Sequence, residues 1–179
     1  MNALAGPFTI ACVLLAAAGA AKALRPGDTA HALAILRIPH ARMLVRVGGG
    51  AELVVGVGAL ALGGPVFATL VAASYLGFAV FVVVALRTGT PISSCGCFGK
   101  ADTPPSAVHV VIDLAAAGVA ASVASTAASV ALPDVVADQP LLGIPFVLLV
   151  AIGSYLVFLS LTALPKTLAA ARVVRDART

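Results

Sequence analysis

The sequence predicts an all-α, polytopic membrane helical bundle, with a four-helix core and a fifth, C-terminal transmembrane helix. Of the 179 residues, 61% are hydrophobic and 10% are charged, whereas soluble domains are roughly 45–50% apolar and about 25% charged. A chain of this length cannot hide so much apolar surface in a globular core, because the surface of a small protein is large relative to its volume. The composition therefore excludes a soluble enzyme, a disordered chain and a small disulfide-stapled secreted protein.

Five apolar stretches approach or exceed the roughly 20 residues that are needed to cross a bilayer. The third and fifth stretches contain no charged residue, and the first lacks the preceding positive charge that is typical of a signal peptide, so we expect it to be a retained helix. The predicted spans are Leu4–Leu24, Val47–Gly64, Val66–Leu86, Val108–Leu132 and Leu141–Leu164.

The segments between these spans carry signals of their own. Between the first and second spans, the short apolar and basic segment His31–Pro39 is expected to lie in the membrane interface. A Gly64–Pro65 turn joins the second and third spans and predicts a tight antiparallel hairpin. Glycines within the spans, such as Gly19 and Gly56, are expected to allow close approach of neighbouring helices.

The distribution of positive charge predicts the orientation in the cell membrane. With five spans, all eleven basic residues fall on one side, whereas the other side carries Asp134 and Asp138. The positive-inside rule then places the N-terminus outside, and the C-terminus and the loop that contains Cys95 and Cys97 in the cytoplasm. The same rule accounts for the net charge of +4 without a nucleic-acid partner. The basic residues are Lys22, Arg25, Arg37, Arg42, Arg46, Arg87, Lys100, Lys166, Arg172, Arg175 and Arg178.

Four ionisable residues lie within the predicted spans, where charge is costly, and all four belong to the membrane half nearest the cysteine loop: Lys22, Glu52, His109 and Asp113. Each has a purely structural interpretation. Lys22 would extend its ammonium to the headgroups, or Glu52 would form a buried ion pair with Lys22 or Arg46. His109 and Asp113 lie one turn apart on one helix face and would tie their helix to its neighbours.

Three cysteines are present, and they fall into two kinds. Cys12 has apolar neighbours and is expected to be a small core residue. Cys95 and Cys97 are separated by one glycine in a loop, and a disulfide closed over so short a span is expected to be strained and easily reduced, as in a redox pair. Lys100 and Lys22 would favour the thiolate form. The alternatives are a soft-metal site made by Cys95, Cys97, His109 and Asp113, and an unreactive pair of thiols.

The run Cys95-Gly96-Cys97-Phe98-Gly99, placed between the third and fourth spans, resembles the MauE family of methylamine utilisation proteins, which is grouped with DoxX-like redox-associated membrane proteins. Gly19-Ala20-Ala21-Lys22 resembles the Gly-x-x-Lys of that family, and Glu52 matches its helical glutamate. The similar spacing covers residues 5–132.

The resemblance implies a four-helix membrane core that acts beside a thioredoxin-like partner. That partnership would form or isomerise disulfides on exported proteins, as in maturation of the small methylamine dehydrogenase subunit. Cys95 and Cys97 would be the redox pair, with Lys22 and Glu52 as supporting polar residues. We therefore expect residues 1–132 to form a MauE-like core with its Cys-Gly-Cys loop at 93–100. Residues 133–179 would add a transmembrane helix (141–164) and a basic cytoplasmic tail.

The charge count and the family role disagree about the side of the membrane on which the cysteines lie. An oxidising role on exported proteins needs Cys95 and Cys97 outside, whereas the count places them in the cytoplasm, where thiols are kept reduced. With the counted topology, the expected chemistry is acceptance of electrons from a cytoplasmic dithiol and their transfer into the membrane.

The leading functional hypothesis is a thiol–disulfide oxidoreductase in which Cys95 and Cys97 exchange a disulfide with a thioredoxin-like partner through a mixed disulfide. No cofactor motif is evident, and a quinone between the helices would serve as the electron acceptor. One alternative is a metal-handling or small-solute transporter in which Glu52, His109 and Asp113 line a polar path. A second alternative is a non-catalytic membrane scaffold subunit. Apart from the lipid, the sequence indicates neither the redox partner nor the oligomeric state.

Overall fold

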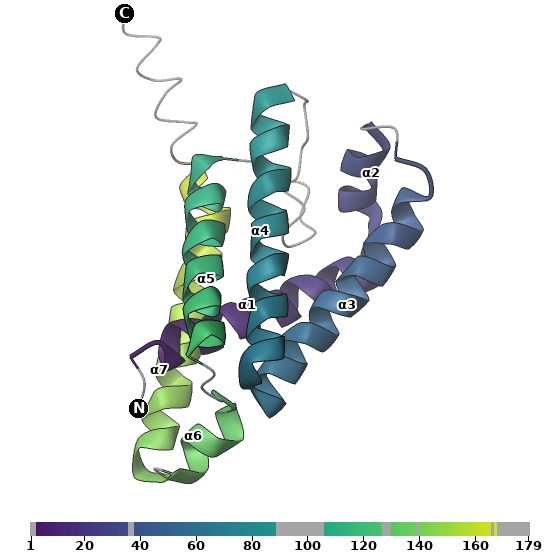
Figure 1. Ribbon diagram of the computed structural model, residues 1–179. Coiled ribbons are helices and arrows are strands. Elements are labelled where there is room, and N and C mark those ends of the chain that lie inside the picture. The colour runs from purple at the N-terminus through teal and green to yellow at the C-terminus, as the bar shows by residue number, and fades with distance from the viewer. Residues whose placement is uncertain are drawn as a thin grey trace, which may run out of the picture.

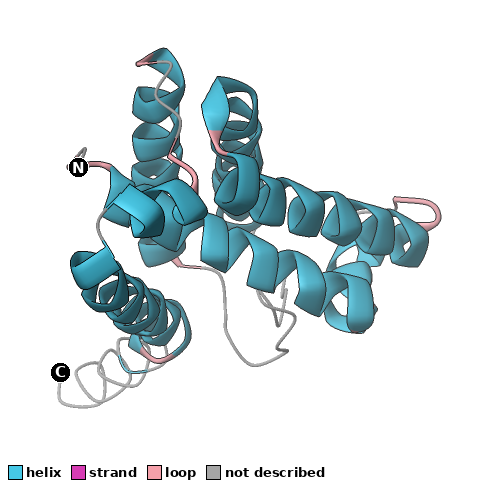
Figure 2. Cartoon of the chain, turned by 90° about the horizontal axis from the view of Figure 1, so that it is seen from below, coloured by secondary structure: helices cyan, strands magenta, loops and turns pink. Residues whose placement is uncertain are grey.

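The computed structural model describes residues 3–35, 38–88, 106–126, 130–138, 140–165 and 167. Within these ranges every regular element is a helix (Figure 2), and five of the helices are long and apolar enough to span a membrane. The predicted class, a polytopic membrane helical bundle, is confirmed. The five long helices are α1 (Ala5–Leu24), α3 (Ala41–Leu62), α4 (Gly64–Thr88), α5 (Ala107–Ser125) and α7 (Pro140–Thr162), and the two short ones are α2 (Gly27–Ile35) and α6 (Leu132–Asp138).

The helices form two differently inclined groups (Figure 1). Helices α4 and α5 pack side by side with α7 beyond α5, whereas α1 and α3 pack against each other and run obliquely to that group. Successive long helices alternate in direction, so that α4 ends and α5 begins at the upper end of the view while the α3–α4 turn lies at the lower end. This alternation is the arrangement expected of a multi-pass membrane protein.

Helix α1 is the central helix of the bundle. Half of its most apolar 18-residue stretch is buried inside the protein, compared with 22–33% for the other four long helices, whose outer faces are left for lipid. Phe8, Cys12 and Leu15 of α1 are all but fully buried, and they share one core with Val123 of α5 and Phe146 of α7. Cys12 is therefore the core residue that its apolar neighbours predict.

Helices α1 and α3 touch along a seam of glycines. A Cβ atom added to Gly19 would lie 2.6 Å from the carbonyl oxygen of Gly49, and one added to Gly49 would lie 2.8 Å from that of Gly19. Two turns further along α3, a Cβ atom on Gly56 would lie 2.7 Å from the backbone nitrogen of Ala16. Since only hydrogen fits at these positions, the prediction that Gly19 and Gly56 allow close packing is confirmed.

The turn between α3 and α4 depends on two further glycines. Gly63 and Gly64 have positive φ angles of 61° and 86°, which residues with a Cβ atom rarely adopt. The chain reverses there, and the Phe67 ring of α4 packs where a Cβ atom on Gly58 of α3 would otherwise lie. The predicted turn between the two spans is confirmed, but α3 and α4 diverge beyond it instead of packing as a tight antiparallel hairpin (Figure 1).

The second predicted span begins too late. Helix α3 starts at Ala41, six residues before Val47, because the exposed Arg42 and Arg46 lie on a helical turn that hydropathy alone does not recognise. Glu52 therefore lies eleven residues into a 22-residue helix, about 16 Å from its start at 1.5 Å per residue. This places Glu52 at the middle of α3 instead of near its end.

The fourth predicted span is too long. Helix α5 ends at Ser125, and α6 is a separate helix with Pro133 in its first turn, where proline is favoured. Near the end of α5, Ser125 donates a side-chain hydrogen bond to the carbonyl of Ser122, and Thr126 donates one to that of Val123. Such bonds compete with the backbone ladder of the helix.

The segment expected at the membrane interface, His31–Pro39, overlaps a helix that begins earlier. Helix α2 covers Gly27–Ile35 and packs against α3. It closes the connection between α1 and α3 at the end of the molecule where α4 ends and α5 begins.

Candidate functional site

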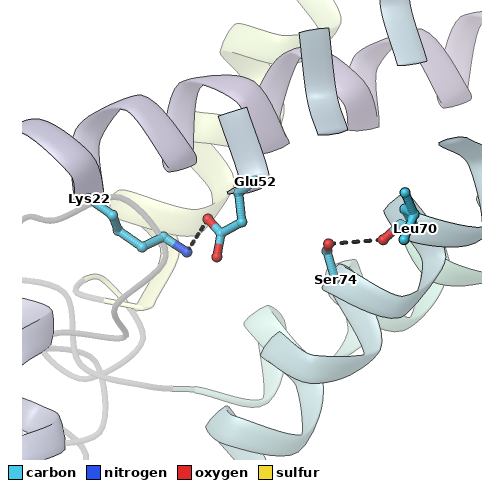
Figure 3. Close-up of polar contacts among 4 residues, drawn as sticks. All are labelled: Lys22, Glu52, Leu70 and Ser74. Atoms are coloured by element: carbon cyan, nitrogen blue, oxygen red, sulfur yellow. Dashed lines mark hydrogen bonds and ion pairs between the residues drawn. The ribbon is translucent and has the colours of Figure 1, made fainter. Parts of the chain in front are cut away.

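Lys22 and Glu52 form an ion pair between α1 and α3 (Figure 3). The Nζ atom of Lys22 lies 2.5 Å from the Oε2 atom of Glu52, and the two side chains are only 6% and 16% exposed. The same seam of glycines makes room for the pair. A Cβ atom on Gly49 would lie 2.8 Å from the Cβ atom of Lys22, and one on Gly19 would lie 2.9 Å from that of Glu52. Each glycine thus faces the charged residue of the opposite helix.

An aromatic ring of α4 completes the surroundings of the lysine. The Nζ atom of Lys22 lies 4.1 Å from the centre of the Phe78 ring, which is a favourable cation–π distance. The expectation that Lys22 extends its ammonium to the headgroups is wrong, because the carboxylate and the ring together hold that group inside the protein. The alternative interpretation, a buried pair between Glu52 and Lys22, is confirmed.

Tyr75, one turn before Phe78, ties α4 to α1. Its hydroxyl donates a hydrogen bond of 2.7 Å to the carbonyl oxygen of Ala11, and its ring meets the Phe78 ring edge to face at 5.8 Å between centres. A buried hydrogen bond of this kind fixes the orientation of the ring as well as the spacing of the two helices.

His109 and Asp113 lie on the buried face of α5, as their spacing predicts. His109 is fully buried and Asp113 is 3% exposed. The Nδ1 atom of His109 is hydrogen-bonded to the Oγ atom of Ser106 at 2.9 Å, so the imidazole closes the first turn of the helix onto the residue that precedes it. The pair therefore presents an imidazole and a carboxyl to the inside of the bundle.

A cavity of about 300 Å³ lies among α1, α4, α5 and α7. Its walls are almost wholly apolar, and Asp113 is the one residue with a carboxyl among the described lining residues. Tyr75 and Phe78 also line it, so the Phe78 ring contacts both this cavity and the ammonium of Lys22. Sequence reasoning missed both aromatic residues, although their spacing of one turn in a mostly aliphatic span was visible.

The structure thus brings Lys22 to Glu52 and places Asp113 at the cavity. The predicted redox residues Cys95 and Cys97, together with Lys100, lie outside the described residues. Among those that are described, no group of three or more histidine, cysteine, aspartate or glutamate side chains is arranged to hold a metal ion. The alternative metal set contains two of the cysteines outside the description, so it stays a hypothesis.

A family model described as methylamine utilisation protein MauE matches residues 2–127, which is more than half of the chain. The matched segment contains the Lys22–Glu52 pair, both cysteines of the Cys-Gly-Cys run, His109 and Asp113, and it ends two residues after α5. Helices α6 and α7 lie outside it. No curated protein and no solved structure matches the chain.

Proposed function

The chain belongs to the MauE family of methylamine utilisation proteins, and from that membership we propose that it is a membrane thiol–disulfide redox protein. Its redox pair is Cys95 and Cys97, and its partner is a soluble thioredoxin-like protein. The observation that carries the proposal is a family match that spans both the Cys-Gly-Cys run and the buried Lys22–Glu52 pair.

The exchange follows ordinary thiol–disulfide chemistry. A thiolate of the reduced partner attacks one sulfur of the Cys95–Cys97 disulfide, so that the bond between those sulfurs breaks and a mixed disulfide forms. The second thiolate of the partner then attacks the mixed disulfide, which leaves the partner oxidised and Cys95 and Cys97 as a dithiol. Two electrons have passed from the partner to the membrane protein.

Lys22 and Glu52 support this chemistry as positioning residues. Their ion pair, with the glycine seam beneath it, sets the spacing of α1 and α3. The positive side of the molecule, which includes the exposed Arg42 and Arg46 of α3, faces the cytoplasm in this proposal. The partner is accordingly a cytoplasmic dithiol protein, and the electrons pass into the membrane.

Trapping of a mixed disulfide tests the proposal. Two variants are prepared for this test. Both contain Cys12→Ser, which removes the buried core thiol, and each also contains either Cys95→Ser or Cys97→Ser. Each variant is incubated with a thioredoxin-like protein whose resolving cysteine is serine and whose remaining thiol is held as a mixed disulfide with thionitrobenzoate. Attack by the free cysteine of the membrane protein then forms the adduct and releases thionitrobenzoate. We expect one of the two single variants to form a covalent adduct on a non-reducing gel that disappears with dithiothreitol.

The matched control is the chain in which both Cys95 and Cys97 are serine, which should form no adduct. If no adduct forms with either single variant and no thionitrobenzoate is released, the exchange model is wrong. The exchange model also predicts that cells with the Cys95→Ser/Cys97→Ser variant lose the function of this protein. If the protein were a scaffold without redox chemistry, the same variant would retain full function.

A further inference from the structure

The cavity among α1, α4, α5 and α7 has a composition that suits a molecule dissolved in the bilayer. All four helices are long and apolar enough to span a membrane, and Pro7 and Ala115 of the cavity wall are exposed on the outer surface, so the cavity opens toward the face that lipid covers. Its volume of about 300 Å³ is at the lower end of the range for small-molecule sites, roughly 300–1,000 Å³. Water is a poor occupant, because stable buried water needs several polar partners and these walls offer few.

The lining groups favour a flat ring with polar edges. The rings of Tyr75 and Phe78 stand nearly perpendicular, at 81°, and form an aromatic corner in the wall of the cavity. The hydrogen bond from Tyr75 to the Ala11 carbonyl holds that corner in place. Asp113 contributes a carboxyl to the same cavity, and carboxylate oxygens accept several hydrogen bonds each. A saturated acyl chain would use neither the aromatic corner nor the carboxyl.

We propose that this cavity binds the ring of a lipid-soluble quinone, which accepts the electrons that the proposed function delivers to Cys95 and Cys97. The inference rests on that function for its redox step and on the cavity for its binding step. Asp113 lies six residues into α5, about 9 Å from the end of the helix to which the cysteine-bearing loop is joined. Asp113 is thus close, along α5, to the helix end that follows Cys95 and Cys97 in the sequence.

The redox step balances without a further reactant. The Cys95–Cys97 dithiol loses two electrons and two protons, so two S–H bonds break and one S–S bond forms. The quinone gains both electrons and both protons, and its two carbonyl oxygens become the hydroxyls of a quinol. A quinol hydroxyl then donates a hydrogen bond to the Asp113 carboxylate, and exchange of quinol for quinone with the bilayer resets the site.

The sequence provides its own reporter for the binding step. The chain has no tryptophan and two tyrosines, of which Tyr75 lines the cavity and Tyr155 is 60% exposed on α7. In a Tyr155→Phe variant, Tyr75 is the sole source of tyrosine fluorescence. The variant is reconstituted in phosphatidylcholine nanodiscs and titrated with decylubiquinone, a benzoquinone with a ten-carbon tail. We expect quenching that saturates with the quinone concentration.

A matched pair of variants on α5 locates the site. Ala115 and Ala121 are both exposed, but only Ala115 lines the cavity among the described residues. Ala115→Leu should raise the apparent Kd for decylubiquinone by at least about fivefold, because added bulk in a filled site is penalised, and Ala121→Leu should leave it unchanged. Ala116→Leu, deeper in the same wall, gives a second reading, and the circular dichroism spectrum verifies that each variant is folded.

Three results would overturn the proposal: quenching that does not saturate, equal affinities for Ala115→Leu and Ala121→Leu, or complete displacement by an equal amount of 1-decanol, which would identify an acyl-chain site. The fluorescence titration reports binding alone and does not require the thiols. It can therefore also be run on a variant in which Cys95 and Cys97 are both serine. A failed titration with successful trapping would remove the quinone site and leave the exchange model. Failed trapping with a successful titration would remove the exchange model and leave a quinone-binding cavity.

Discussion

At the scale of single residues, the charge of Lys22 is compensated inside the bundle by two groups from different helices. Glu52 of α3 supplies the carboxylate, and Phe78 of α4 supplies the face of a ring. Burying either charge alone would be expensive, because an isolated ion loses its hydration without recovering an equivalent interaction. Lys22, Glu52 and Phe78 together therefore link α1, α3 and α4. Removal of one charge of the ion pair should be more harmful to stability than removal of both charges.

A double-mutant cycle measures this linkage. We expect Glu52→Gln to destabilise the folded protein by about 3–5 kcal/mol, since the Lys22 ammonium is left buried without its counter-charge. Lys22→Met should have a comparable effect, whereas the double variant should lose clearly less than the sum. Unfolding in mixed micelles with increasing dodecyl sulfate, followed by circular dichroism, provides the free energies.

Arg46→Met serves as the control for that cycle, because Arg46 is exposed on the same helix as Glu52. Its effect should be within about 0.5 kcal/mol of zero. Additive effects of the two core substitutions would show that Lys22 and Glu52 contribute independently, contrary to the contact between them.

At the scale of elements, the α1–α3 contact is decided by where glycine stands in α3. Gly48, Gly49 and Gly50 are consecutive, yet only the middle one of the three faces α1. A Cβ atom on Gly49 would meet backbone atoms of Gly19 and Ala23 at 2.8 Å, whereas one on Gly48 or Gly50 would meet nothing within 4 Å. Neighbouring glycines in the same run thus have different structural roles.

Two alanine substitutions separate these roles. Gly49→Ala should destabilise the protein by about 1–3 kcal/mol, because the backbones of α1 and α3 must move apart. Gly48→Ala introduces the same methyl group into open space and should be neutral or slightly stabilising, since alanine has a higher helix propensity than glycine. Thermal unfolding in detergent compares the two variants directly. Equal melting temperatures would contradict the tight seam that the structure shows.

At the scale of the whole molecule, the described residues contain five helices that are long and apolar enough to span a membrane, and an odd number of spans would place the two ends of the chain on opposite sides. The positive charges at helix ends then favour one of the two orientations. Arg25 follows the last residue of α1, Arg42 and Arg46 lie in the first two turns of α3, and all three are exposed. The end of α1 and the start of α3 lie toward the same end of the bundle as the start of α5 (Figure 1). Because the cysteine-bearing loop joins α4 to α5, its side of the membrane is determined by the same orientation.

Labelling of cysteines in intact cells tests the orientation. In a Cys12→Ser background, we expect Cys95 and Cys97 to resist a membrane-impermeant maleimide in intact cells and to react in inverted vesicles, each after mild reduction. Detergent-solubilised protein gives the total reactive thiol as the reference. Labelling in intact cells would place the pair outside, reverse the proposed topology and favour an oxidising role on exported proteins.

The sequence by itself determined the membrane class, the number of candidate spans, the α3–α4 turn and the buried role of Cys12. These features depend on local composition: apolar length, glycine at a turn, and a small thiol among apolar neighbours. Helix ends were less accessible, because a helix can extend past its apolar part, as α3 does through Arg42 and Arg46, or stop where serine and threonine side chains bond to the backbone, as α5 does.

Only the tertiary structure decided how the polar residues are combined. Lys22 carried two interpretations in the sequence, and the choice between them depended on a carboxylate thirty positions away and on a ring of a third helix. The cavity beside Asp113 is likewise built from four helices, none of which encodes it alone. The composition of a helix shows whether that helix is apolar enough to lie in lipid. Which of its faces packs against another helix depends on contacts between segments that are distant in the chain.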